Sequence, residues 1–156
     1  MADKSFTEVK LSQEQIDNAN LIADKANEHG VNADLALAMA WQENKFHTKG
    51  KSSAGAVGLL QVMPANAEAY GYKVEDLHDP NINADIGMKI LKENLDRFNN
   101  PRAALVAYNA GPNTAEKYLA KGEDFSVLHS ETKNYLEDIH KIYPLTEARE
   151  IGRAHV

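Results

Sequence analysis

Four of the five prolines in this chain stand where a helix would begin, and this punctuation limits the fold more than any other feature. Proline has φ close to the helical value and lacks the N–H that a helix interior needs, so it suits the first turn of a helix. The pattern predicts helices that start at Pro64, Pro80, Pro101 and Pro112. Pro144, the fifth, precedes a charged and weakly periodic end.

Capping residues and the spacing of apolar side chains predict three more helices. Ser12 with Gln15 fits a capping box for a helix that Gly30 ends. Asn32 is a good N-cap for a helix that runs to about Phe46. A last helix, over about 130–142, can be capped by Ser130, and the four proline helices should end near Gly71, Asn99-Asn100, Tyr108 and Ala120.

Only residues 47–58 interrupt the helical pattern for long, since they are rich in Gly, Ser and Lys and are typical of a loop. We expect a mainly α fold with room for a short β-ribbon near residues 47–60. At 156 residues the chain should form a single domain over 1–156. Its packed core should cover about 12–143, and residues 144–156 should form a loose tail.

Composition narrows the function classes. The chain has no cysteine, which excludes disulfides, thiolate metal sites and a cysteine nucleophile. A net charge of −6 argues against nucleic acid as the main partner, because phosphate binding needs a clustered basic face. No stretch approaches the ~20 apolar residues of a membrane span, and the N-terminus shows no apolar segment of a secretory signal.

Several familiar site motifs fail on inspection. Gly50-Lys51-Ser52 resembles the end of a phosphate-binding loop, but Lys45 stands where that loop needs its first glycine. The segment 79–83 begins like a calcium-binding loop, yet Ala84 and Ile90 stand where glycine and glutamate are required. The six histidines lie far apart and no nucleophile elbow occurs. We therefore expect no phosphate-binding loop, calcium loop or zinc site.

Glu43 is the strongest catalytic candidate. It ends the apolar helical run that begins at Ala33 and directly precedes the loop. A carboxyl group on a rigid, largely buried element is expected to have a raised pKa, because burial disfavours its charged form. A carboxyl that stays protonated near neutral pH can donate a proton to a leaving group.

Three segments and a late helix make a known pattern together. They read Trp41-Gln42-Glu43-Asn44, then Gly58-Leu59-Leu60-Gln61-Val62-Met63-Pro64, then Ala107-Tyr108-Asn109-Ala110-Gly111, and Glu131-Thr132-Lys133-Asn134-Tyr135. In this order they resemble the catalytic domain of the soluble lytic transglycosylases, which is related in fold to goose-type lysozyme. The resemblance covers roughly residues 15–143. Asn44 replaces the usual serine after the catalytic glutamate, and Leu60 replaces the commoner methionine.

The resemblance implies the substrate and a role for each matched residue. The substrate would be the peptidoglycan glycan strand, cut between N-acetylmuramic acid and N-acetylglucosamine. Glu43 would act as the single acid and base, and neither a metal nor an organic cofactor would be needed. Gln61, Tyr108 and Asn109 would bind the sugar and its N-acetyl group, and Met63 would pack on a sugar face. Ser52 and Tyr135 would bond near the substrate or Glu43, with Asn44 in support.

Two other functions remain open from the sequence. A hydrolytic, goose-type lysozyme-like enzyme would need a second carboxylate, which Asp76, Asp79 or Asp85 could supply. The second alternative is a glycan-binding module that has lost its enzymatic activity. We expect action at the bacterial cell wall or periplasm by a monomer, either phage-encoded, in the virion or at lysis, or a periplasmic enzyme trimmed of its leader.

Overall fold

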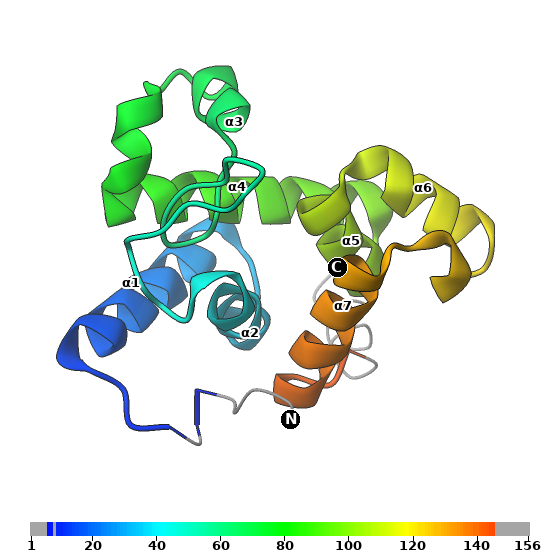
Figure 1. The fold of residues 1–156 in the computed structure, drawn as a ribbon, viewed down its shortest axis with the longest axis horizontal. Helices are drawn as coiled ribbons and strands as arrows, with labels where there is room; N and C mark the ends of the chain where they lie inside the picture. Colours follow the sequence, from blue (N-terminus) through cyan, green and yellow to red (C-terminus); the bar gives the residue numbers. More distant parts are fainter. Residues whose placement is uncertain (1–5, 8, 146–156) are drawn as a thin grey trace. The chain divides into compact units, whose positions relative to one another are not determined.

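The computed structural model describes residues 6–7 and 9–145, and these residues form a helical protein (Figure 1). This part of the chain contains seven α-helices and two short 3-10 helices. No strand forms in it, and two isolated bridges, Lys51 with Val57 and Val57 with Val62, stand where a β-ribbon had room to form. The predicted mainly α fold is therefore confirmed.

Backbone contacts divide the chain into two compact units, with the boundary between Lys89 and Ile90. We call them the N-terminal unit and the C-terminal unit. The boundary falls inside helix α4 (Pro80–Phe98). Whether the chain unfolds as a single domain stays a prediction. Among the described residues, none of the helices combines the length and the apolar composition needed to cross a membrane.

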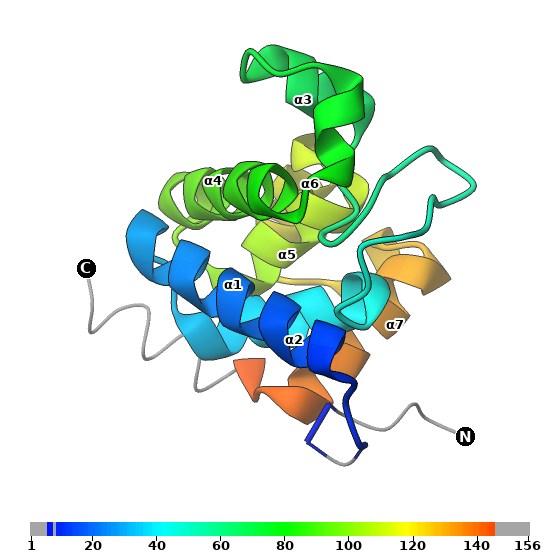
Figure 2. The same cartoon turned by 90° about the vertical axis from the view of Figure 1, so that its left-hand side faces the viewer.

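The N-terminal unit is built on helices α1 (Gln13–His29) and α2 (Ala33–Asn44), which pack against each other (Figure 2). The predicted capping box forms between Ser12 and Gln15, and Gly30 ends α1 in the left-handed conformation. Asn32 caps α2 by accepting a hydrogen bond from the Leu35 N–H at 3.0 Å. The largest fully buried side chains of this unit are Ile22, Met39, Phe46, Leu59, Leu60, Leu77, Ile86 and Met88.

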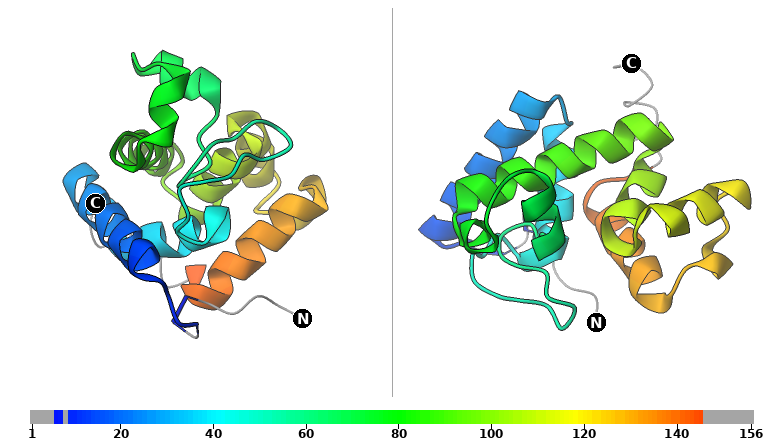
Figure 3. Two further views of the ribbon diagram at one scale, coloured as in Figure 1. Left: turned by 60° about the vertical axis from the view of Figure 1, so that its left-hand side comes forward. Right: turned by 90° about the horizontal axis from the view of Figure 1, so that it is seen from above.

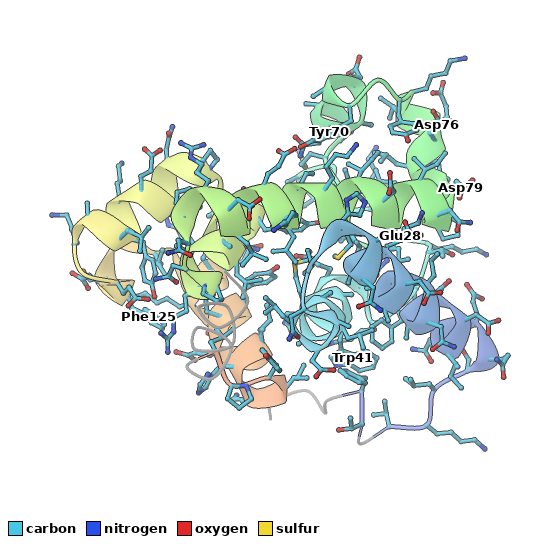
Figure 4. The ribbon with its side chains drawn as sticks, turned by 180° about the vertical axis from the view of Figure 1, so that it is seen from behind. Glu28, Trp41, Tyr70, Asp76, Asp79 and Phe125 are labelled. Carbon is cyan, nitrogen blue, oxygen red and sulfur yellow. The ribbon has the colours of Figure 1, made fainter. Side chains whose placement is uncertain are left out.

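An irregular segment of residues 45–63 leads from α2 to helix α3 (Pro64–Ala69), which is followed by the 3-10 helix η1 (Val74–His78) and by α4 (Figure 3). The ammonium group of Lys89 lies 5.3 Å from the centre of the Tyr70 ring, which ties α4 to the end of α3 (Figure 4).

The C-terminal unit is centred on helix α5 (Pro101–Ala110), which packs on helix α6 (Pro112–Ala120) and helix α7 (Ser130–Ile142). A second 3-10 helix, η2 (Phe125–Val127), lies between α6 and α7. Asn100 caps α5 by accepting from the Ala103 N–H at 3.1 Å. Its largest fully buried side chains are Leu91, Leu105, Tyr118 and Leu136.

Helix starts agree with the sequence better than helix ends. All four proline helices begin at their proline. The predicted ends at about Phe46 and about Tyr108 are each off by two residues, because α2 ends at Asn44 and α5 ends at Ala110. The prediction that Ser130 caps α7 is wrong, since Ser130 is its first residue and His129 is the N-cap. Of the expected tail, Leu145 is buried and its N–H donates to His140 Nδ1 at 2.9 Å, while 146–156 lie outside the described residues.

Candidate active site

Glu43 lies in the last turn of α2, one residue before the helix ends. The helix is buried as far as Trp41, and Gln42, Glu43 and Asn44 are only half-buried. Trp41 packs in an aromatic cluster, with ring centres 5.3 Å from Phe46 and 6.1 Å from Phe6. The helix therefore holds the Glu43 backbone on a packed base, while Glu43 itself is half-buried.

The chain leaves α2 through two residues in the left-handed conformation, Lys45 with φ 51° and Phe46 with φ 63°. Side chains of α1 hold this turn. Gln15 Nε2 donates to the Lys45 carbonyl at 2.9 Å, and Asn18 Nδ2 donates to the Phe46 carbonyl at 2.7 Å. These bonds from α1, which is far away in sequence but packs on α2, explain why α2 ends two residues earlier than its own sequence predicts.

Asn44 secures the start of the irregular segment. Its Nδ2 lies 2.9 Å from the carbonyl oxygens of His47 and Lys49 and 3.1 Å from that of Gly58. One side-chain amide thus gathers three backbone carbonyls from both ends of the segment. A serine, with a single hydroxyl hydrogen, could donate to one of them only. In this chain Asn44 acts as a clasp on the loop beside Glu43.

The Gly-Leu-Leu-Gln turn is held from the other side by Asn83 of α4, a fully buried side chain. Asn83 Oδ1 accepts from the Leu60 N–H at 2.8 Å, and its Nδ2 donates to the carbonyls of Val57 and Leu77 at 2.8 and 2.9 Å. Gly58 has φ +76°, and a Cβ there would lie 2.7 Å from Asn83 Nδ2. Only glycine allows this close approach.

Gln61 follows in the left-handed conformation, with φ 49°. Its Nε2 donates to the carbonyl of Gly58 at 2.9 Å, with Gly50 O at 3.4 Å, so the amide nitrogen is engaged with the loop. Ser52 is exposed and accepts from the Ala56 N–H at 3.0 Å. Met63 is 40% exposed, which leaves an apolar surface at the start of α3.

The remaining predicted residues belong to the C-terminal unit. Tyr108 and Asn109 lie half-buried in the last turn of α5, and Tyr135 is buried on α7. Thr132, also buried, donates its hydroxyl hydrogen to Asn109 Oδ1 at 2.7 Å. The helices α5 and α7 are thereby joined at the third and fourth motifs.

Of the predicted residues, Glu43, Asn44, Ser52, Gln61 and Met63 are on the N-terminal unit, and Tyr108, Asn109 and Tyr135 are on the C-terminal unit. Sequence reasoning missed four side chains that position them, namely Gln15, Asn18, Asn83 and Thr132. Asn83 was noticed only as part of a failed calcium motif. The signal available in the sequence was a polar residue on an otherwise apolar face of a helix.

The three carboxylates that could serve a hydrolase have structural partners. Asp76 accepts from the Lys73 N–H at 2.9 Å, and Asp79 accepts from the Asn81 N–H at 2.8 Å. Figure 4 shows these two carboxylates beside η1 and the start of α4. Asp85 lies 2.7 Å from His29 Nε2. Each of the three therefore has a helix-capping or ion-pairing role.

One group among the described residues has three potential metal ligands within 4.8 Å of one another, namely Glu28, His29 and Asp85. Lys25 Nζ lies 3.2 Å from Glu28 Oε2 and 3.9 Å from Asp85 Oδ1. The lysine and the histidine supply hydrogen-bond donors to both carboxylates, so the group is explained as an ion-pair network.

The motifs lie within a segment that matches a known protein family. The model of the transglycosylase SLT domain matches residues 20–128, which include every predicted site residue except Tyr135. The chain belongs to the transglycosylase SLT domain family. The resemblance seen in the motifs is thus confirmed.

Relatives of the SLT domain family come from phages and bacteria. The transglycosylase of Enterobacteria phage PRD1 is 35% identical over 88 residues, 56% of this chain and 32% of that protein. The peptidoglycan transglycosylase gp16 of Escherichia phage T7 is 30% identical over 133 residues, 79% of this chain and 10% of that protein. This SLT domain therefore spans a third or less of the length of these relatives.

The fold comparison gives the same family. The crystal structure of the 70 kDa soluble lytic transglycosylase of Escherichia coli superposes with a TM-score of 0.69 at 30% identity. The match covers 79% of this chain and 23% of the larger one. The lysozyme-like helical fold expected from the motifs is therefore present in this SLT domain.

Proposed function

We propose that this SLT domain is a peptidoglycan lytic transglycosylase that cleaves the β-1,4 bond between N-acetylmuramic acid and N-acetylglucosamine. The observation that carries the proposal is family membership over residues 20–128 with Glu43 retained in the last turn of α2. The relative from phage T7 is named a peptidoglycan transglycosylase.

Glu43 would act twice in one turnover. As a general acid it gives its proton to the glycosidic oxygen while the bond from that oxygen to the anomeric carbon breaks. As a carboxylate it then takes the proton of the same sugar's 6-hydroxyl, whose oxygen bonds to the anomeric carbon. The product is a 1,6-anhydro ring, Glu43 returns to its protonated form, and no water is consumed.

Two features of α2 suit this role. The last turn of a helix carries partial negative charge, which favours the neutral form of a carboxyl group there. The last turn of α2 itself contains no lysine, arginine or histidine, and the C-cap residue Lys45 has its ammonium group 4.9 Å from the centre of the Trp41 ring. The structural roles of Asp76, Asp79 and Asp85 also favour a mechanism with one carboxyl group over hydrolysis with two.

The other matched residues would bind the glycan. The exposed thioether of Met63 suits a sugar face, and the half-buried Gln61, Tyr108 and Asn109 offer polar atoms to the sugar and its N-acetyl group. Ser52 and Tyr135 would bond near the substrate or Glu43. We further propose that the enzyme is a monomer without cofactor or metal. It would act at the bacterial cell wall, as the relatives from phages suggest.

Product analysis of purified peptidoglycan tests the proposal. The wild-type protein should release fragments that end in 1,6-anhydro-N-acetylmuramic acid, seen by mass spectrometry. Glu43→Gln should lower the rate by about 10²–10⁴-fold, the usual contribution of acid–base catalysis. Glu137→Gln on α7, an exposed glutamate outside the motifs, is the matched control and should keep full activity.

Three outcomes would contradict the proposal in different ways. Fragments ending in reducing muramic acid would identify a hydrolase. Glycan binding without any cleavage by the wild type would identify a binding module. Unchanged cleavage by Glu43→Gln would remove Glu43 from the mechanism.

A further inference from the structure

Three polar side chains are classed as buried among the described residues, and one of them differs from the other two. Asn18 and Asn83 bond to the backbone and so stabilise turns of the chain. Thr132, 3% exposed, has its bond to another side chain, the amide of Asn109. A buried hydroxyl that serves a half-buried amide points to a role in placing that amide.

The environment of Thr132 explains why its hydroxyl reaches Asn109. A threonine inside a helix commonly donates back to the carbonyl four residues earlier, but Thr132 is the third residue of α7, and Leu128, four residues before it, lies outside the helix. Thr132 instead donates its single hydrogen across to α5, over 2.7 Å. Tyr135 lies three residues later on the same buried face of α7, followed by Leu136 and Ile139. The packing of this face on α5 holds the hydroxyl in place.

The bond fixes which end of the Asn109 amide is available. A side-chain amide has one acceptor oxygen and two N–H donors. With the oxygen of Asn109 bonded to the Thr132 hydroxyl, the two N–H donors of the amide are the atoms left for a ligand. The structure records no bond from Asn109 Nδ2 to the described residues, and the side chain is half-buried at the end of α5. Asn109 therefore offers hydrogen-bond donors.

We propose that Thr132 is a positioning residue that orients Asn109 so that its Nδ2 donates to an acceptor oxygen of the glycan, the carbonyl oxygen of an N-acetyl group. The carbonyl oxygen of the N-acetyl group is the strongest neutral acceptor on these sugars. The N–H of that group is a donor, so it cannot pair with the N–H donors of Asn109. This inference rests on the proposed function, since it names the atom of the proposed substrate that Asn109 binds.

Substitutions at Thr132 test the orientation. Thr132→Val keeps the volume and removes the donor, whereas Thr132→Ser keeps the donor. We expect Thr132→Val to weaken glycan affinity and raise KM by about tenfold, the scale of one hydrogen bond, with kcat changed much less. Thr132→Ser should restore affinity to within about threefold of the wild type.

The chain offers a matched control. Thr114 on α6 donates to the backbone carbonyl of Ala110 at 3.3 Å, and this hydrogen bond reaches none of the predicted site residues. Thr114→Val removes the same chemical group from a part-buried site in the same unit. It should leave glycan affinity and KM unchanged, so that a general effect of replacing threonine by valine is separated from the loss of the Asn109 contact.

Asn109→Asp tests the polarity of the contact directly. A carboxylate keeps an oxygen for the Thr132 hydroxyl but has no donor, so the fold should survive while glycan affinity falls at least as far as in Thr132→Val. Asn109→Asp with wild-type affinity would overturn the proposal, and so would Thr132→Val with wild-type affinity and KM. Asn109→Asp also keeps the test decisive if Thr132→Val does not fold.

Affinity is measured with an N-acetylated muropeptide glycan in the Glu43→Gln background, where no cleavage interferes. The two proposals can then fail separately. If the wild type forms no anhydro product but affinity still falls in Thr132→Val and recovers in Thr132→Ser, the proposed function fails and the positioning role stands. If anhydro product forms and the glycan affinity does not change with the substitutions at Thr132 and Asn109, the positioning role alone is wrong.

Discussion

The irregular segment 45–63 and helix α5 both carry residues proposed to bind the glycan, yet different interactions hold them. In the segment, three non-glycine residues and three glycines have positive φ, and the amides of Asn44 and Asn83 bond to backbone groups along it. In α5, the helix bonds and the packing on α6 and α7 fix the backbone, and one side-chain bond orients Asn109. Irregular backbone needs side chains from elsewhere to satisfy its polar groups, whereas a helix satisfies its own.

This contrast predicts where substitutions cost most. Removal of the buried Asn83 amide of α4, which bonds to the segment, takes a hydrogen-bond partner from several backbone groups at once. Removal of the Thr132 hydroxyl leaves the helices intact and affects the orientation of a single amide. The segment should therefore report defects as lost stability, and α5 should report them as lost affinity.

The largest effect is expected for Asn83→Leu. The variant has a similar volume, but it loses the three bonds from Asn83 to the Leu60 N–H and to the carbonyls of Val57 and Leu77. Of these groups, the Val57 carbonyl keeps its bond from the Val62 N–H at 3.0 Å. Since each unsatisfied buried group costs about 1–3 kcal/mol, we expect roughly 3–5 kcal/mol less unfolding free energy in urea. Asn81→Leu, exposed on the same helix, should change it by less than about 0.5 kcal/mol. Equal stability of the two variants would show that Asn83 does not hold the turn.

Gly58→Ala should rank next. The new Cβ would lie 2.7 Å from Asn83 Nδ2 and 3.0 Å from the Leu77 carbonyl oxygen. Left-handed backbone with a Cβ costs about 1–2 kcal/mol and overpacking costs about 1–3 kcal/mol, so we expect a loss of roughly 2–4 kcal/mol. Gly55→Ala, with φ +98° and no atom within 4 Å of its Cβ, should lose the backbone part only. Chemical denaturation measures both, and a smaller loss in Gly58→Ala than in Gly55→Ala would rule out the close contact with Asn83.

Asn44→Ser should have a smaller and more local effect. The serine hydroxyl can donate to one carbonyl where the amide reaches those of His47, Lys49 and Gly58. We expect a loss of about 1–2 kcal/mol. Hydrogen exchange followed by mass spectrometry should show faster amide exchange than in the wild type for residues 47–58 and unchanged exchange for α5 to α7. Faster exchange in both parts would mean that the clasp supports more than its own segment.

The sequence predicted the parts of the fold that local chemistry decides. The capping box of Ser12 and Gln15, the Asn32 cap and the four proline starts all depend on residues within one turn of the helix end. The motifs led correctly to the family because their order and spacing can be read along the chain.

The rest depends on partners far along the chain. The end of α2 is set by Asn18, 28 residues before Phe46, and Asn83 bonds to Leu60 from 23 residues away. Nothing within one turn of these positions signals such a bond. Spacing alone also did not separate the roles of Asn44 and Asn109, since one amide bonds to the backbone and the other receives a hydroxyl.

The smallest effect is expected at Asp124, which makes the same kind of bond as Asn83 but in full contact with solvent. Its carboxylate accepts from the Ser126 N–H at 2.9 Å at the start of η2. That bond is the main cause that lowers the pKa of Asp124 below the ordinary value of 3.8, with the Ser126 side chain, Lys121 and Lys133 acting in the same direction.

Because the pKa is lowered in the folded state, the charged carboxylate stabilises the fold above the ordinary pKa, and this contribution is lost as the pH falls through the folded value. Asp124→Asn should therefore have a slightly lower Tm than the wild type at pH 7, and the two Tm values should converge on acidification. A difference that persists at low pH would mean that the cap acts by geometry and not by charge. Asn83 and Asp124 each accept from a backbone N–H over a similar distance, 2.8 and 2.9 Å. The larger effect is expected at Asn83 because it makes three such bonds to the backbone and because an unpaired polar group costs more when it is buried.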